Sequence, residues 1–175
     1  TLDAQGNWVA ISAPVAGSDG AILADAGRFI AAEKPEQARA LLDAWIAGNG
    51  RGQSPYLPAA YLMRGDAISA SGDEYAALYD YEFVIRQFPA APEFVKANER
   101  ELEIATAYVR GLDRKWLGIR WVSATDVGIE LLIRIQERMP GSRLGEQAGI
   151  ELADYYYRNR ELALAATSYE LFLKN

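Results

Sequence analysis

Three glutamates alternate along one short stretch, at Glu99, Glu101 and Glu103, with Arg100 after the first. Two carboxylates can act as the acid and base of glycoside hydrolysis when they occupy different environments across a cleft. Glu99 and Glu103 are four residues apart, so they would share one face of a helix, as in a solvated charged stripe. We therefore expect this cluster to lie on a helix surface and to perform no chemistry.

The side chains most used in catalysis and metal binding are absent, because the sequence contains no cysteine and no histidine. This absence excludes disulfides, thiol nucleophiles, thiolate or imidazole metal sites, and triads that use histidine as the base. The glycine-rich segment 48–52 lacks the lysine and the preceding strand of a phosphate-binding loop. We predict a protein that is not an enzyme and that uses no cofactor and no metal.

The net charge of the chain indicates which classes of partner it can bind. The chain has 18 basic and 24 acidic residues, a net charge of -6 at pH 7. A surface with this balance repels nucleic acid and anionic membranes, and no apolar run approaches the roughly 20 residues that span a bilayer. We therefore expect protein or peptide partners and no nucleic acid.

Residues 111–123 combine two tryptophans with three basic side chains. The candidate protein-binding residues of this segment are Arg114, Lys115, Trp116, Arg120 and Trp121. Large aromatic residues and arginine are common anchors of protein interfaces, because they bury a large area at low entropic cost. The alternative is that the apolar residues fold back over the neighbouring helices and leave the charges solvated; these residues are Trp116, Leu117, Ile119 and Trp121. Composition alone fits both interpretations.

The elements that position these residues are predicted to be helices. Apolar residues recur at helical spacing from Asp19 onward, and short breaks rich in Gly, Pro or Ser divide them. The pattern predicts helices at about 19–32, 35–47, 55–71, 73–88, 91–111, 124–138, 142–159 and 161–174. Asp73 is predicted to be an N-cap, and Ser123 with Asp126 to form a capping box. Residues 1–18 lack the pattern, which predicts an extended N-terminal arm or linker.

Small and aromatic residues recur at fixed offsets within successive helix pairs. Gly65 is followed after twelve residues by Ala77 and after four more by Tyr81. The last pair repeats this order with Ala153, Ala165 and Tyr169. These offsets are typical of tetratricopeptide repeats, in which small residues allow close helix contact. We predict an all-α, tetratricopeptide-like α-solenoid of about four helical hairpins over residues 19–175, interrupted in the third hairpin by an insertion at about 111–123.

In such a solenoid the first helices of the hairpins line an inner surface that can bind a peptide. The predicted inner-surface residues include Asp66, Leu102, Thr106, Arg110, Asp154, Tyr157 and Arg158. The candidate protein-binding residues among them are Asp66, Arg110, Asp154, Tyr157 and Arg158. An ordinary solvated face is the alternative interpretation of the same pattern.

The closing stretch 153–158, with Tyr169 and Phe172 after it, resembles the repeat of BamD-type outer-membrane protein assembly lipoproteins. Segments 77–82 and 138–142 are similar to the helix ends of that family. The resemblance implies a periplasmic, outer-membrane-associated protein that works with the β-barrel insertase and its substrates. It also implies that membrane attachment comes only from a lipid on a cysteine upstream of Thr1.

Together, the residues and the resemblance lead us to expect a non-catalytic protein-binding scaffold in outer-membrane protein assembly. The alternatives are a generic tetratricopeptide adaptor and an accessory helical domain of an envelope hydrolase. The fourth unit stops just before a terminating proline would be due, so we expect the array to continue beyond Asn175.

Overall fold

The computed structural model describes residues 15–49 and 54–174, and within these residues the chain is mostly helical. Eight helices occur there, close to the eight predicted segments: α1 (Asp19–Ala31), α2 (Pro35–Asn49), α3 (Leu57–Ala70), α4 (Glu74–Gln87), α5 (Glu93–Val109), α6 (Thr125–Arg138), α7 (Arg143–Arg158) and α8 (Leu162–Lys174). Most of the predicted N-terminal arm, residues 1–14, lies outside the described residues.

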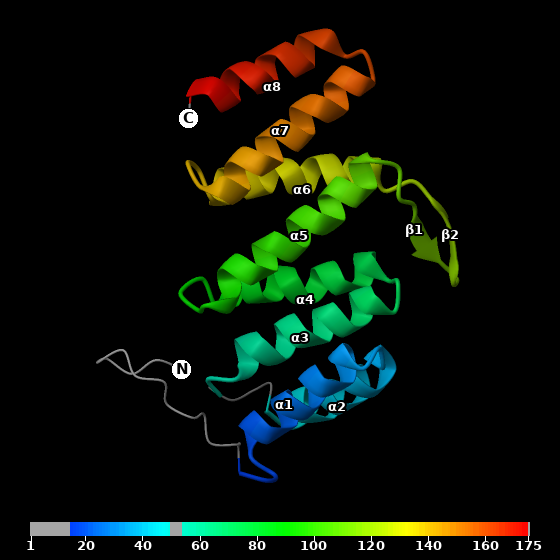
Figure 1. Cartoon of the computed structure of the whole chain (residues 1–175), viewed down its shortest axis with the longest axis vertical. Coiled ribbons are helices and arrows are strands. Elements are labelled where there is room, and N and C mark those ends of the chain that lie inside the picture. The colour runs from blue at the N-terminus through cyan, green and yellow to red at the C-terminus, as the bar shows by residue number, and fades with distance from the viewer. Residues whose placement is uncertain (1–14, 50–53, 175) are drawn as a thin grey trace.

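The helices pack in chain order, each against the next as an antiparallel neighbour, and they stack along the long axis of the molecule (Figure 1). Helix α1 also contacts α3, α3 contacts α5, and α5 contacts α7. The first helices of the successive pairs therefore form one continuous side of the stack. This arrangement agrees with the predicted helical hairpins.

The first helix of each pair ends in the same kind of turn. One residue in the left-handed region follows each of these helices: Glu33 (φ 56°), Gly72 (φ 79°), Gly111 (φ 101°) and Arg160 (φ 61°). The next backbone N–H donates to a carbonyl five residues earlier in all four turns: Lys34 to Phe29, Asp73 to Ile68, Leu112 to Ala107, and Glu161 to Tyr156. This bond defines the Schellman motif, so one local geometry reverses the chain four times.

The recurring small and aromatic residues lie where two helices come closest. A Cβ added at Gly65 would lie 2.5 Å from Cε1 of Tyr81, whose side chain is fully buried. The Tyr81 hydroxyl donates to Oδ1 of Asp66 at 2.9 Å, and the Tyr169 hydroxyl donates in the same way to Asp154. Glycine at position 65 is therefore required by the tyrosine ring that fills the space between α3 and α4.

One of the two predicted caps is confirmed. The Asp73 carboxylate accepts a hydrogen bond from the Ala76 backbone N–H at 3.1 Å, as an N-cap does. The predicted capping box at Ser123 is wrong, because α6 begins one residue later, with Ala124 at the N-cap position. Ala124 is buried in the core beside α4 and α5, and this packing fixes where the helix starts.

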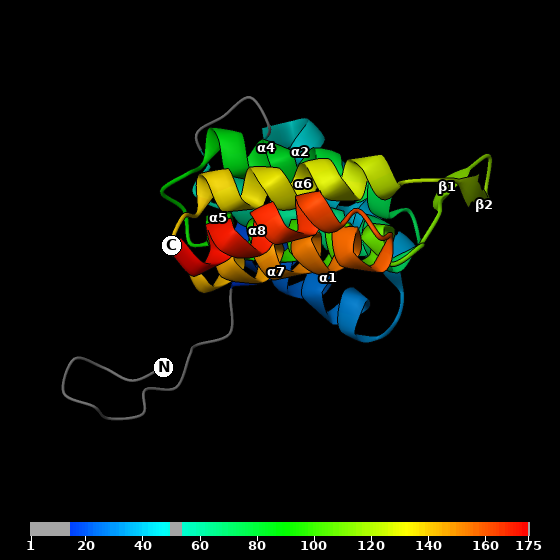
Figure 2. The same ribbon diagram turned by 90° about the horizontal axis from the view of Figure 1, so that it is seen from above.

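The prediction of an all-α chain is wrong for the insertion. Strands β1 (Arg114–Trp116) and β2 (Ile119–Val122) pair as an antiparallel hairpin between α5 and α6. Leu117 and Gly118 form its two-residue loop with φ values of 50° and 82°, the signs that a type I′ turn requires. The hairpin projects from the side of the helical stack (Figure 2).

The expectation of a solvated glutamate stripe on α5 is wrong for Glu101. Glu99 and Glu103 are exposed, but the Glu101 side chain is 1% exposed. Its Oε2 accepts a hydrogen bond from Nη1 of Arg138 at 2.7 Å. Residues two apart lie on nearly opposite sides of a helix, so the middle carboxylate faces α6 when its neighbours face solvent.

Candidate protein-binding hairpin

Exposed and partly buried side chains alternate along β2, although its pairing with β1 is irregular between Arg114 and Lys115. Ile119 and Trp121 point away from the helices and are 67% and 64% exposed, whereas Arg120 between them is partly buried. Leu117 at the tip is 88% exposed. We name Leu117, Ile119 and Trp121 the apolar tip; each of these side chains is exposed, and all three belong to one projecting hairpin.

The basic residues of the hairpin face the turn that joins α3 and α4. Lys115 Nζ donates to the Ser71 carbonyl oxygen at 2.7 Å, and Arg120 Nη2 donates to the Gly72 carbonyl oxygen at 3.1 Å. These carbonyls stand at the C-terminal end of α3, where the helix dipole favours positive charge. The β-hairpin, which is inserted in the third helical hairpin, is thus attached to the turn of the second helical hairpin.

A partly buried ion pair adds to this attachment. Arg120 Nη2 donates to both carboxylate oxygens of Glu74, at 2.7 and 2.9 Å, and Nη1 donates to the Asp113 carbonyl oxygen at 2.8 Å. The hydrogen bond to Glu74 raises the pKa of Arg120 above its ordinary value. The Arg114 guanidinium lies 4.6 Å from the ring centre of Tyr75 on α4, a cation–π contact.

These contacts decide between the two interpretations of residues 111–123 for most of the segment. The apolar residues Leu117, Ile119 and Trp121 do not fold back over the helices, and the basic residues are not merely solvated. The side chain of Trp116 lies outside the described part of the structure. The arrangement is therefore the opposite of the second interpretation. The charged side chains attach the hairpin to the helices, and the exposed apolar side chains face solvent.

The five candidate protein-binding residues predicted for the inner surface divide into two groups. Asp66 accepts hydrogen bonds from Tyr81 and from Nε of Arg100 (2.8 Å), and Arg110 Nη2 donates to Glu151 at 2.7 Å. With Asp154, which accepts from Tyr169, these residues join neighbouring helices. Tyr157, at 62% exposed, and Arg158 remain on the surface of α7.

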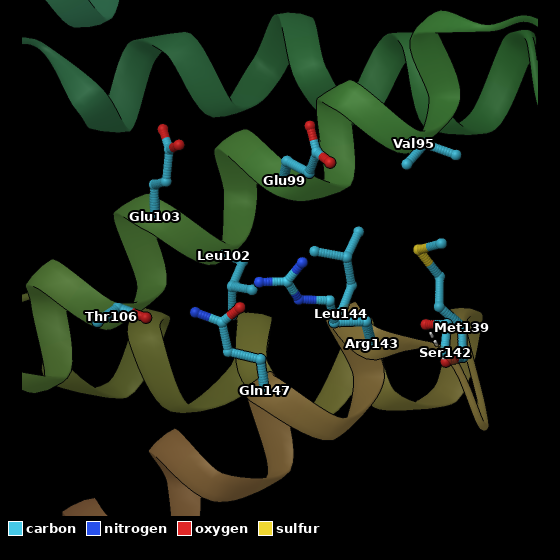
Figure 3. Close-up of a pocket in the computed structure, with 10 residues that line it drawn as sticks. All are labelled: Val95, Glu99, Leu102, Glu103, Thr106, Met139, Ser142, Arg143, Leu144 and Gln147. Carbon is cyan, nitrogen blue, oxygen red and sulfur yellow. Dashed lines mark hydrogen bonds between the residues drawn. The ribbon is translucent and has the colours of Figure 1, made fainter.

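A cavity of about 710 Å³ lies between the first helices α5 and α7 (Figure 3). Its lining residues are Val95, Glu99, Leu102, Glu103, Thr106, Met139, Ser142, Arg143, Leu144 and Gln147. Of the predicted inner-surface residues, Leu102 and Thr106 belong to this lining. The first helices thus do form a hollow, but the structure builds it from residues other than the five candidate protein-binding residues predicted for that surface.

Two further kinds of site, a metal-binding cluster and a membrane-spanning helix, are absent from the described residues. Within residues 15–49 and 54–174, no group of three or more Asp or Glu side chains is arranged to hold a metal ion. The helices in the same ranges include none that is long and apolar enough to cross a bilayer. In comparisons with known proteins, the sequence matches no family model and no curated protein.

Proposed function

We propose that the protein is a non-catalytic scaffold that binds another protein through the apolar tip of its β-hairpin. The observation that carries the proposal is the conformation and exposure of Leu117. Its φ of 50° is in the left-handed region, which costs an ordinary residue on the order of 1 kcal/mol. A type I′ turn prefers asparagine, aspartate or glycine at this position.

Packing within the described chain does not account for this leucine, since 88% of its side chain is exposed. Trp121 and Ile119 of the same hairpin are also exposed, and several exposed apolar side chains on one projecting element are typical of an interaction site. Four polar or cationic contacts to α3, α4 and their turn hold the hairpin in place before a partner arrives. Such preorganisation lowers the entropic cost of binding.

For the scaffold itself we propose a tetratricopeptide-type array. Two observations support this assignment beyond the spacing of small residues. The hydrogen bond from Tyr81 to Asp66 has a counterpart from Tyr169 to Asp154, at the same separation of 15 residues. The four first helices also end in the same Schellman turn.

For the partner we propose the β-barrel insertase of the bacterial outer membrane. The support is the resemblance of segment 153–158 and its surroundings to BamD-type assembly lipoproteins. On this proposal the protein acts in the periplasm, attached to the outer membrane only through a lipid on an upstream cysteine.

Photocrosslinking tests this proposal at single-residue resolution. A photoreactive phenylalanine analogue replaces Trp121 in one variant and Tyr157 in another, because both positions are well exposed and lie on different elements. Irradiation in envelope preparations should join the insertase barrel subunit to the position-121 variant and not to the position-157 variant. Crosslinking from position 157 alone would instead assign binding to the first-helix side.

A further inference from the structure

The last helical pair, α7 and α8, shares a hydrogen bond with the second pair, α3 and α4. Tyr169 donates to Asp154 as Tyr81 donates to Asp66, in each case across 15 positions. Aligning the two pairs on this bond gives each residue of the last pair a counterpart in the second. The pairs differ in what comes next, because α5 follows the second pair, whereas no described helix follows α8.

The side of the second pair that faces α5 is buried. Leu62 on α3 and Ile85 on α4 belong to one core cluster with Ile104 of α5. The third pair has the same arrangement. Leu102, which like Leu62 lies three residues before the small residue of its helix, is buried in a cluster with Leu152 of α7. In both pairs, the next first helix therefore covers this side.

The same side of the last pair is open at the end of the stack (Figure 1). Ile150, the counterpart of Leu62, is 38% exposed, and Leu173, the counterpart of Ile85, is 79% exposed. Leu162, about three turns earlier on the same face of α8, is 60% exposed. We name Ile150, Leu162 and Leu173 the end face. Exposed apolar side chains on one side of a protein are typical of an interaction site, and the other pairs show that a helix fits there.

A second observation indicates one side chain of the covering helix. Asp66 accepts a hydrogen bond from Nε of Arg100 on α5, at 2.8 Å, in addition to the one from Tyr81. Asp154 accepts from Tyr169, but no arginine among the described residues donates to it. The counterpart of Arg100 is therefore missing, and a helix on the end face would supply it.

The boundary between the third and fourth pairs supports this comparison. Thr106 occupies the position of Asp66 in α5. In α7 the position of Arg100, five residues before the small residue of its helix, is taken by the fully buried Ala148. The aspartate and the arginine are thus present together at one boundary and absent together at the next. An aspartate at position 154 therefore favours an arginine opposite it.

We propose that the end face binds an amphipathic α-helix of a partner protein, antiparallel to α8, with an arginine that donates to Asp154. Its apolar residues would cover Ile150 and Leu173 as α5 covers their counterparts. A second copy of this chain fits poorly. Helix α1, at the other end of the stack, has no exposed large apolar side chain, and a net charge of -6 opposes self-association.

Fluorescence anisotropy with a labelled peptide tests the end face. The probe has the sequence of residues 93–109, the helix that covers the equivalent side of the second pair, and its matched control carries Arg100→Met. We expect saturable binding of the probe to the full chain. The control should bind about tenfold more weakly, the loss of a charge-assisted hydrogen bond. No binding of the probe, or equal binding of the two peptides, would overturn the proposal.

Two variants of the protein test the assigned contacts. Asp154→Asn removes the charge and keeps an acceptor for Tyr169. It should weaken the probe about tenfold and should not weaken the Arg100→Met peptide further. Leu173→Ser, at an exposed position, should weaken both peptides about tenfold or more. Glu99→Gln, an exposed change on α5, should have no effect. Equal effects of Asp154→Asn on the two peptides, or undiminished binding by Leu173→Ser, would contradict the site.

Two further measurements identify the occupant. In sedimentation analysis, a monomer that binds the probe supports a separate partner. Self-association that Leu173→Ser abolishes would assign the end face to a second copy. Protein isolated from its natural source that binds no probe would assign the face to a helix of its own chain. Either of these two results would overturn the partner.

The inference rests on the packing of the helices and does not depend on the β-hairpin. Trp121→Ser should bind the probe as wild type does. Failure of the peptide to bind would therefore leave the hairpin proposal intact, and the converse also holds.

Discussion

Arg120 Nη2 donates to both carboxylate oxygens of Glu74, at 2.7 and 2.9 Å, although 46 positions separate the two residues in sequence. The arginine belongs to β2 and the glutamate to the first turn of α4. The pair therefore fastens the insertion between α5 and α6 to a different helical hairpin. It is partly buried, with side chains 32% and 16% exposed, so solvent screens it less than a surface pair.

The first prediction concerns the energy of this pair. A double-mutant cycle of Arg120→Gln and Glu74→Gln should give a coupling free energy of about 1 kcal/mol in urea unfolding. The matched control is the more exposed pair Arg134 and Glu130, whose coupling should stay at or below about 0.5 kcal/mol. Equal coupling energies for the two pairs would show that the Arg120–Glu74 ion pair attaches the hairpin no more strongly than a surface pair.

The second prediction concerns the strained loop. Leu117→Asn should stabilise the hairpin by about 0.5–1 kcal/mol, because asparagine tolerates the left-handed conformation that leucine adopts there. Amide hydrogen exchange of β1 and β2 measures this change even if the helices unfold independently. Gly118→Ala is the opposing variant, since φ is 82° at that position, and it should speed exchange. Slower exchange in both variants would argue against the type I′ turn.

The third prediction concerns the contact between Gly65 and Tyr81. Gly65→Ala places a Cβ where the fully buried tyrosine ring lies, so it should lower the free energy of unfolding by about 1–3 kcal/mol. Gly48→Ala is the control: it is also helical, and a Cβ there meets nothing within 4 Å. That variant should keep or raise stability, by up to about 1 kcal/mol. If Gly65→Ala is as stable as wild type, the Tyr81 ring does not require glycine at position 65, and the argument for close packing of α3 against α4 fails.

The fourth prediction concerns pH. Burial raises the pKa of Glu101 from an ordinary value of 4.5 to about 7, so the folded protein holds a proton that the unfolded chain releases. The stability contributed by this proton is present at acidic pH and is lost as the pH rises through about 7. Between about pH 5 and pH 8 the free energy of unfolding should fall by on the order of 2 kcal/mol from this group.

Glu101→Gln should flatten that part of the pH profile, and Glu103→Gln, an exposed change on α5, should leave it unchanged. Glu82 adds to the effect, because its charge and its hydrogen bond with Glu101 also raise the pKa of Glu101. Although burial opposes the effect, Arg138 lowers the pKa of Glu82, so its own contribution changes at more acidic pH. Thermal melting of the three proteins across the range measures the slopes. Equal slopes for wild type and Glu101→Gln would refute the assignment.

The helices could be predicted from sequence because their causes are local. Apolar spacing and the breaks after Gly72, Pro89 and Pro140 fix each helix within a few residues, and the Asp73 cap needs only its own turn. The β-hairpin could not be predicted because its own local signals are weak. A four-residue strand shows only one cycle of alternation, and the Leu117 loop lacks the asparagine that usually marks a type I′ turn.

The polar partners could not be predicted, since they depend on which helices meet. Spacing places Asp66 and Arg110 on a first-helix surface, but it does not reveal that Arg100 and Glu151 face them across neighbouring helices. Likewise, spacing grouped Glu101 with its exposed neighbours. Its burial follows from the approach of α6 and of Arg138, which lies 37 residues away in sequence.

The most direct test of the hairpin proposal is a binding measurement with the purified β-barrel insertase. Wild type is compared with Trp121→Ser, and Arg158→Ser, an exposed change at the C-terminal end of α7, serves as the control. We expect Trp121→Ser to weaken the complex by at least about thirtyfold, the loss typical of an interface anchor, and to leave thermal melting unchanged. Arg158→Ser should bind as wild type does. Undiminished binding by a folded Trp121→Ser protein would contradict the account.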